Sequence, residues 1–464
     1  MKRFSKNLLS LLAGDLFRRI LGFIAVAVLA RRVGADGFGM VNVALTVLSY
    51  AVLAGSAGLA SYGTREIAGG AGPELAGRIT GCRLFLSLFV FILILTFTQV
   101  AIENRTTGIL ISLCCLSVFS NSVFLDWYFQ GKEKMTVVGS ARAVSAGVYL
   151  ITVLLLVRSG SDIIWVAVGA LAGDAAAAFI FVKYYKIGYG SLRLRFEPAE
   201  WLGLLRKSFP LGAGSVFAAL SVNIAPLAIG IILTNVQVGV YSAAAKLTFF
   251  LLIIDRIFGS LILPASARLF GESAEKMGET LKFASKWIIT VSLPAALGGT
   301  LLSKRIIFII FGFQYGPAAP VFGVLVWYFF VTLVHTVFMS GMIAAGREKT
   351  YGRLMMWSFF INLITVCAGT YFYSEIGAAA GVVFSETVTM LVMRQRMKKY
   401  FYIPIGGHIL KLLPALAAMT AVLLIVPSRF VLIAVAAGAA VYCAVVLMTR
   451  AITPAELRGA LKHL

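Results

Sequence analysis

The sequence has few charged residues for its length. Only 13% of its 464 residues are charged, and 60% are hydrophobic, whereas soluble globular proteins are about 25% charged and about 45–50% apolar. This composition excludes a soluble globular enzyme, a disordered chain and a secreted disulfide scaffold. A helix that spans a bilayer needs about 20 apolar residues, so about fourteen such helices would account for most of the hydrophobic content.

Sequence signatures of catalysis and metal binding are also missing. The chain contains no Walker A, HExxH or GxSxG motif and no acidic metal cluster. Its five cysteines lie inside apolar runs without CxxC or zinc spacing, which is typical of structural membrane cysteines. We therefore expect no catalytic residue, no metal site and no bound cofactor, in a protein that is not an enzyme.

Acidic residues are scarce compared with basic ones, because 19 Asp and Glu stand against 41 Lys and Arg, a net charge of +22. In a soluble protein this excess would indicate nucleic-acid binding, but here the basic residues mostly lie in short loops between apolar runs. Most of them fall on the cytoplasmic side if both termini are cytoplasmic, as the positive-inside rule requires. We expect that orientation, no nucleic-acid partner and no cleaved signal peptide.

The apolar runs predict an all-α, polytopic membrane protein with about fourteen transmembrane helices. We expect two repeated six-helix lobes at 1–203 and 204–404, then two C-terminal helices with a cytoplasmic tail at 405–464. Segment 303–317 is apolar but too short to span, which indicates an external re-entrant or interfacial piece. The predicted spans are 8–30, 39–62, 80–101, 108–129, 137–157, 163–183, 209–233, 240–263, 284–303, 318–343, 354–373, 377–393, 409–427 and 430–449.

A weak internal repeat supports the two lobes. Segment 33–44, VGADGFGMVNVA, aligns with segment 233–244, LTNVQVGVYSAA, so that Gly39 matches Gly239 at an offset of 200 residues. Two glycine-containing turns can match by chance, but this alignment also superposes the first six predicted spans on the next six. Two halves repeated in the same orientation, with a site at their interface, are an architecture of transporters.

Ionisable residues inside the predicted spans are the candidate functional residues, because each costs about 2.5–3.5 kcal/mol at mid-bilayer unless a cavity or partner compensates. In the first span Asp15, Arg18 and Arg19 share one helical face, and Asp15 can neutralise only one of the two arginines. A cationic, water-filled cavity would suit an anionic substrate. The cations predicted to bind that substrate are Arg18, Arg19, Arg65, Lys246 and Arg256.

The alternative is that these cations join helices by pairing with carboxylates, and both interpretations stay open. Buried carboxylates can also carry a proton or ligate sodium, so Asp15, Asp174 and Glu386 are candidates for charge pairing or for a coupling ion, H⁺ or Na⁺. His335 lies on an otherwise apolar span and is expected to be a satisfied packing residue. The carboxylates available for pairing within the spans are Asp126, Asp174, Asp255 and Glu386.

Three parts of the sequence resemble one family. They are the stretch LFRRILGFIAVAVLARRVGADGFGMVNVALTVLSY continued by GLASYGTREIA, the segment VGVYSAAAKLTFFL, and the segment GFQYGPAAPVFGVLVWYF. They are similar to polysaccharide flippases of the Wzx type, which handle O-antigen and exopolysaccharide units, in the multidrug/oligosaccharidyl-lipid/polysaccharide (MOP) exporter superfamily. Fourteen spans suit this family better than its multidrug-efflux relatives, which usually have twelve.

The resemblance implies a bundle that moves an undecaprenyl-diphosphate-linked oligosaccharide from the inner to the outer leaflet of a bacterial inner membrane by alternating access. It places the family's intramembrane cations at Arg18 or Arg19, at Arg65, and at Lys246 or Arg256, and it adds a groove for the polyprenyl tail at the last two spans. The implied partners are the lipid-linked oligosaccharide, membrane lipids and other membrane proteins of polysaccharide assembly. The alternatives are a peptidoglycan-precursor (lipid II) flippase, a multidrug exporter and a membrane-embedded glycan enzyme.

Overall fold

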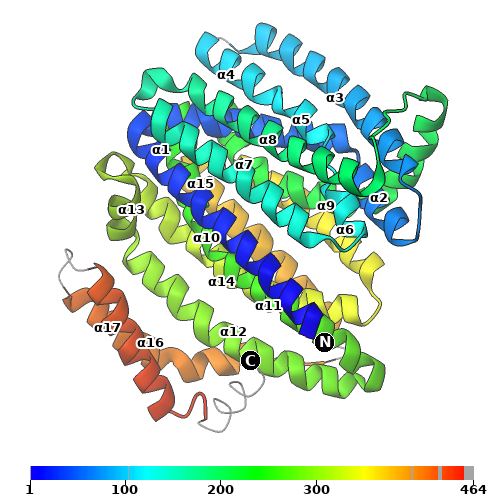
Figure 1. The fold of residues 1–464 in the computed structure, drawn as a ribbon. Coiled ribbons are helices and arrows are strands. Elements are labelled where there is room, and N and C mark those ends of the chain that lie inside the picture. The colour runs from blue at the N-terminus through cyan, green and yellow to red at the C-terminus, as the bar shows by residue number, and fades with distance from the viewer. Residues whose placement is uncertain (1, 103, 399–400, 427–430, 454–464) are drawn as a thin grey trace. The chain divides into compact units, whose positions relative to one another are not determined.

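The computed structural model is helical throughout the part of the chain that it describes, with no strand there (Figure 1). It forms two compact units, Met1–Ser242 and Ala243–Leu464. The predicted all-α fold is confirmed, while the lobe boundary predicted at 203–204, which falls inside one continuous helix, stays a prediction. The described residues are 2–102, 104–398, 401–426 and 431–453, with the backbone alone at 2–18, 101, 210–216, 218 and 219.

Unit 1 (Met1–Ser242) begins with two helices that meet at Gly34. This residue has φ 72° and ψ 179°, a conformation that glycine adopts readily, and it divides the long helix α1. Helices α7 and α8 lie side by side (Figure 1). The elements are α1 Lys2–Ser56, α2 Leu59–Ala68, α3 Glu74–Ala101, α4 Arg105–Cys115, α5 Ser117–Ser122, α6 Asp126–Gly131, α7 Met135–Leu156, η1 Gly160–Asp162, α8 Ile164–Tyr189, α9 Pro198–Ile232 and the start of α10, Asn235–Leu251.

The core of unit 1 contains a buried aromatic cluster. Trp127, Tyr128 and Phe129 of α6 are each at most 2% exposed and pack with residues of α2, α7 and α8. Gly63 on α2 makes room for them, because a Cβ there would lie 2.4 Å from the Trp127 ring. The short helix α6 is therefore anchored by aromatic packing rather than by its own length.

The basic linker between α8 and α9 is attached to α3. The carbonyl oxygens of Arg193 and Arg195 approach Gly77 and Gly81 so closely that a Cβ at either glycine would lie 1.9 or 2.3 Å away. Ion pairs between α3 and residues 195–200 reinforce this contact. The linker therefore belongs structurally to unit 1.

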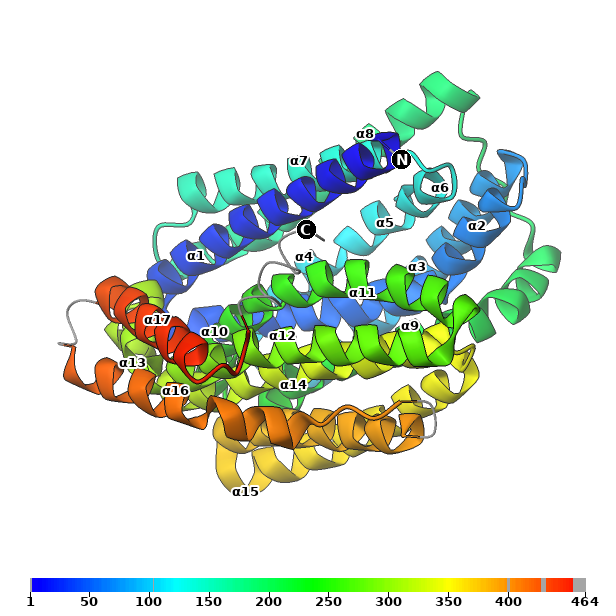
Figure 2. The same cartoon turned by 90° about the horizontal axis from the view of Figure 1, so that it is seen from below.

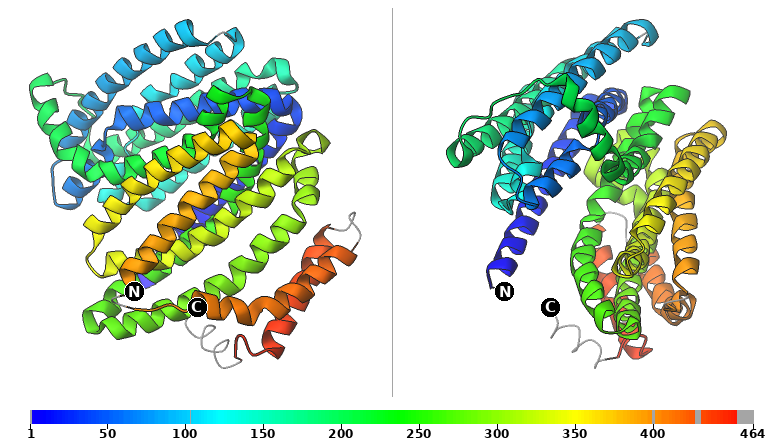
Figure 3. Two further views of the ribbon diagram at one scale, coloured as in Figure 1. Left: turned by 180° about the vertical axis from the view of Figure 1, so that it is seen from behind. Right: turned by 90° about the vertical axis from the view of Figure 1, so that its right-hand side faces the viewer.

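Unit 2 (Ala243–Leu464) contains the antiparallel hairpin α15, which is broken at Ser374 (φ 53°). A Cβ at Gly377 would lie 1.9 Å from the Gly369 carbonyl oxygen, and one at Gly381 would lie 2.6 Å from that of Thr365. Figure 3 shows the two halves side by side, in yellow and orange. The further elements are α11 Ile253–Glu272, α12 Ala274–Leu301, α13 Ser303–Phe311, η2 Phe313–Tyr315, α14 Ala318–Ala344, α15 Glu348–Met397, α16 Ile405–Ile425 and α17 Val431–Met448.

The core of unit 2 lies mainly between α12, α14 and α15, and it extends to the last two helices. Helices α16 and α17 pack against each other, and α16 also packs against α12 (Figure 2). The C-terminal pair is therefore joined to the rest of this unit through α12.

Ten helices in the described chain are long and apolar enough to cross a membrane, or eleven if α12 and the short α13, bent by 75° from it, form one span. Helices α1 and α15 are counted once each, although a break divides both. Counting their halves separately raises the number of candidate spans in the described chain from ten to twelve. The bent pair and α9, which ends in the apolar helix Leu220–Ile232, supply the remaining two of the fourteen predicted spans. The multi-pass membrane fold is thus confirmed, and segment 303–317 forms α13 and η2 as a short piece.

Candidate functional site

The two turns predicted to be repeats of each other are in close contact. A Cβ on Gly39 would lie 1.7 Å from the carbonyl oxygen of Asn235, and a Cβ on Gly239 would lie 1.9 Å from that of Ala35. Residues 35 and 235 are related by the same offset of 200 as the two glycines. The contact is therefore reciprocal, as expected for equivalent elements related by a two-fold axis, and it supports the repeat found in the sequence.

The predicted cations of unit 1 lie on α1 and α2. Arg18 and the candidate pairing residue Asp15 are on α1, in the part where side chains lie outside the described residues. Arg19 is half-buried on the same helix, and Arg65 is exposed in the last turn of α2. The substrate-binding role of these residues, and the choice between Arg18 and Arg19, stay predictions.

The predicted cations of unit 2 are Lys246 and Arg256. Lys246 is partly buried in the apolar part of α10, and its ammonium has no hydrogen bond or ion pair with any residue that the structure describes. Leu252, with ψ 0°, separates α10 from α11, so the two cations lie on consecutive helices that together form one candidate membrane span, Asn235–Glu272. Arg256 is exposed, while its neighbour Asp255 is directed to α14.

The carboxylates of unit 1 have different kinds of partner. Asp174 on α8 accepts hydrogen bonds from Asn121 Nδ2 at 2.8 Å and from Ser145 Oγ at 3.4 Å. Asp126 forms an ion pair with Arg142 at 2.6 Å. Asp126 therefore has an ion-pair partner, but Arg142 is not one of the five predicted cations, and Asp174 is held by neutral donors.

Two carboxylates and an imidazole meet in unit 2. Glu386 on α15 and His335 Nδ1 on α14 are hydrogen-bonded, and the next residue, Thr336, donates to Asp255 Oδ1 of α11 at 2.5 Å. His335 is buried and satisfied, as predicted, and its partner is Glu386, one of the candidates for charge pairing or for a coupling ion. Such a set can hold and exchange a proton. No group of three or more metal-ligating side chains occurs among the described residues.

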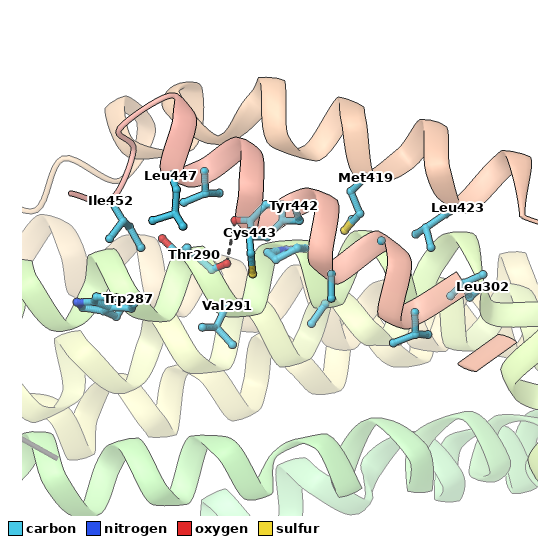
Figure 4. A pocket seen from close by; sticks show the side chains of 16 residues that line it. Trp287, Thr290, Val291, Leu302, Met419, Leu423, Tyr442, Cys443, Leu447 and Ile452 are labelled. Atoms are coloured by element: carbon cyan, nitrogen blue, oxygen red, sulfur yellow. Dashed lines mark hydrogen bonds between the residues drawn. The ribbon is translucent and has the colours of Figure 1, made fainter. Parts of the chain in front are cut away.

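An apolar pocket of about 550 Å³ lies between α12, α16 and α17 (Figure 4). Its labelled lining residues include Trp287, Val291, Met419 and Leu447. The Tyr442 hydroxyl does not leave a polar group in the pocket, because it donates to the Thr290 carbonyl oxygen at 2.9 Å. The pocket is therefore suited to hydrocarbon rather than to a sugar or a phosphate.

Comparison with known proteins identifies the family. Residues 4–270, more than half of the chain, match the model of the polysaccharide biosynthesis protein family. The chain belongs to this family. A putative O-antigen transporter of Shigella dysenteriae is 21% identical over 293 residues, which are 61% of this chain and 70% of that protein. The recognition of a polysaccharide flippase relative in the sequence is thereby confirmed.

Solved structures similar to this polysaccharide biosynthesis family member establish the fold. One is titled lipid II flippase MurJ, inward closed conformation, with TM-score 0.78, 16% identity and coverage of 94% of this chain and 98% of that one. Another is an inward-facing multidrug resistance MATE family transporter of the MOP superfamily, with TM-score 0.67, 15% identity and coverage of 82% and 95%. The chain has their fold. The family match includes all five predicted cations, whereas the His335–Glu386 pair and the α16–α17 pocket lie beyond it.

Three further arginines of this family member cap helix ends. Arg32 Nη1 lies 2.7–3.1 Å from three carbonyl oxygens at the end of α7. Arg83 is only 5% exposed and donates to the carbonyl oxygens of Asn121 and Phe124, at 2.7 and 3.0 Å. Arg305 donates to a carbonyl just beyond α16. These cations bond to carbonyl oxygens at helix ends, where a helix has fewer backbone donors than carbonyls, so a structural role accounts for their charge.

Sequence reasoning missed Arg83 and the pairing of His335 with Glu386. Arg83 lies close to the start of a predicted span, where arginines are common, so nothing in the sequence marks it as buried. His335 and Glu386 are 51 residues apart, and no helical spacing relates residues on different helices. The only available signal was that each is an ionisable residue inside an apolar run.

Proposed function

We propose that this protein is a flippase that moves an undecaprenyl-diphosphate-linked oligosaccharide repeat unit from the inner to the outer leaflet of the bacterial inner membrane. Family membership and the name of the O-antigen transporter relative support this substrate class. The reciprocal contact between the repeated turns supports two halves that work by alternating access. The distribution of basic residues supports cytoplasmic termini.

Lys246 carries the proposal, because its charge lies in an apolar helix without a described partner. An ammonium in that setting is costly unless an anion or water compensates it. A diphosphate offers several anionic oxygens to such a cation. The polyprenyl tail stays in the lipid, so only the headgroup has to reach a hydrated site. Arg18 or Arg19, Arg65 and Arg256 are the other cations proposed to attract that headgroup.

The test is transport of a fluorescent undecaprenyl-diphosphate oligosaccharide in proteoliposomes, read by its accessibility to an external lectin or quencher. We expect Lys246→Gln to lower the initial rate by at least about 10-fold, and Lys246→Arg to retain most of it, because charge is the property required. Lys282→Gln is the matched control, since Lys282 is an exposed lysine on α12. Equal rates for the wild-type, K246Q and K282Q proteins would contradict the assignment.

The coupling ion is proposed to be a proton carried by Glu386 and His335. Their hydrogen bond joins α14 to α15, so a change of protonation at this pair alters a contact between helices. We expect a pH gradient to accelerate transport in wild-type vesicles and to have no effect on Glu386→Gln. Acceleration by a sodium gradient at constant pH would instead favour Na⁺, with Asp174 as the next candidate.

The apolar pocket between α12, α16 and α17 is proposed to accommodate part of the polyprenyl tail. Its hydrocarbon lining and its position in the C-terminal helix pair support this role. We expect Ala439→Phe, which would fill the pocket, to slow transport of a long-chain substrate more than transport of a short-chain analogue. Equal slowing of both substrates would contradict the proposal that the pocket accommodates the polyprenyl tail.

A lipid II flippase is the second candidate, and the fold it shares with the structure titled lipid II flippase MurJ favours it. Lipid extraction from a deletion strain separates the two. Accumulation of a polyprenyl-linked glycan without peptide would support the O-antigen or exopolysaccharide substrate. Accumulation of a peptide-bearing precursor would support lipid II instead.

A further inference from the structure

A pocket of about 600 Å³ lies at the junction of α14 and α15, apart from the residues discussed so far. Gly346, with φ 66°, ends α14 in a tight turn, and the Arg347 backbone N–H then donates to the Met342 carbonyl oxygen at 3.0 Å. The C-terminal end of the α15 hairpin supplies the opposite wall. We call this the α14–α15 pocket, and its lining includes Met342, Arg347, Thr350, Gln395, Arg396 and Lys398.

The polar lining of the α14–α15 pocket consists of hydrogen-bond donors that suit an anion. Arg347, Arg396 and Lys398 are cationic, and Thr350 and Gln395 can donate from a hydroxyl and an amide. No carboxylate occurs among the described residues that line the pocket. Arg396 and Lys398 form no ion pair with any described residue. Arg396 and Lys398 line the same pocket and repel each other, so an anion bound beside them would be stabilised by both.

The position of the pocket favours an anion at the membrane surface. It lies where α14 ends and α15 begins and ends, and these are membrane-spanning helices. Its lining also includes two apolar side chains, Met342 and Met397, which are each 1% exposed. Cations beside apolar side chains suit the phosphate of a lipid headgroup whose chains enter the bilayer beside the helices.

We propose that the α14–α15 pocket binds the phosphate group of an anionic phospholipid. This site is separate from the proposed flipping pathway, and the inference does not depend on the flippase function. A bound headgroup would neutralise the charges of Arg396 and Lys398, where the α15 hairpin ends beside the turn between α14 and α15.

The experiment is native mass spectrometry of the full-length protein, purified in detergent and incubated with phosphatidylglycerol or with phosphatidylcholine. We expect phosphatidylglycerol to remain bound, and Arg396→Gln/Lys398→Gln to weaken its apparent affinity about 10- to 30-fold, at about fivefold for each cation. Arg206→Gln/Lys207→Gln is the matched control, because it removes two exposed cations of α9 that do not line the pocket. It should change the affinity less than threefold.

Two further measurements complete the experiment. One uses a variant that keeps all the cations, as a control for misfolding, and the other distinguishes a lipid phosphate from free inorganic phosphate. Gln395→Glu places a negative charge in the pocket without removing a cation, and it should weaken phosphatidylglycerol binding while gel filtration stays unchanged. Inorganic phosphate at millimolar concentration should neither compete with the lipid nor raise the melting temperature. Stabilisation by free phosphate without lipid retention would overturn the lipid assignment. Equal weakening by the pocket variant and the α9 control would overturn the site itself.

Discussion

Replacing Gly39 or Gly239 with alanine should destabilise the protein, because each glycine touches the backbone of the other turn. The new Cβ would lie 1.7 Å from the Asn235 oxygen in G39A and 1.9 Å from the Ala35 oxygen in G239A, whereas real Cβ atoms essentially never approach closer than 3.0 Å. The turns would therefore have to separate by about 1.3 Å in G39A or about 1.1 Å in G239A. Overpacking typically costs about 1–3 kcal/mol, and we expect about 3 kcal/mol because a backbone carbonyl cannot rotate away as a side chain can.

The assay is the melting temperature of the purified protein, followed by loss of the monodisperse peak in gel filtration. A cost of about 3 kcal/mol corresponds to a fall of roughly 6–12 °C for a unit of this size. Gly147→Ala and Gly139→Ala are the controls, because nothing lies within 4 Å of a Cβ at either position on α7. These controls should be neutral or slightly stabilised, since alanine favours a helix more than glycine does.

The double variant tests whether the two glycines share one contact. If the same separation relieves both clashes, G39A/G239A should cost clearly less than the sum of the two single variants. Single variants that melt like the α7 controls would refute the close contact. Costs that add fully would show that the two sites are independent, and the reciprocal contact between repeats would then be wrong.

The remaining predictions are measured in the same way. Arg83→Gln should cost about 3 kcal/mol or more, because it removes two hydrogen bonds from a buried charged donor. Arg78→Gln, which breaks partly exposed ion pairs, should cost under about 1 kcal/mol, and similar losses for the two variants would contradict a buried cap. Tyr442→Phe should cost about 1 kcal/mol by removing the bond to Thr290, and an unchanged melting temperature would argue against that bond. Ser374→Gly should stabilise the protein by about 1 kcal/mol, because glycine tolerates φ 53°, and destabilisation would contradict the strained turn.

The sequence was sufficient to predict the fold class because the membrane constrains it strongly. Long apolar runs must be helical, since every backbone polar group in lipid needs an internal partner. The connections were harder to predict. A loop was expected before the second span, but Gly34 turns the chain within a single residue. The break between α10 and α11 at Leu252 has no glycine or proline to mark it.

The candidate site could be predicted only as a list of residue types. Cations within apolar runs stand out in the sequence, and so do buried carboxylates, but which pairs meet depends on helices distant in the chain. Asp126 forms an ion pair with Arg142, 16 residues away in the sequence, while Glu386 is hydrogen-bonded to His335, 51 residues away. The repeat was more informative than the charges. The same offset of 200 residues relates Gly39 to Gly239 and also relates the two residues whose carbonyl oxygens they contact, Ala35 and Asn235.

Positive charge on the helices of this protein has two distinct physical explanations, and the local backbone separates them. A guanidinium has five donors, so Arg32 and Arg83 can each bond to several carbonyls at a helix end, and no ligand is needed. Lys246 lies within α10, where the carbonyls are already engaged by the helix, so this compensation is not available to it. An intramembrane cation is therefore a candidate substrate ligand when it is away from a helix end, and this criterion selects Lys246 before Arg65, which lies in the last turn of α2.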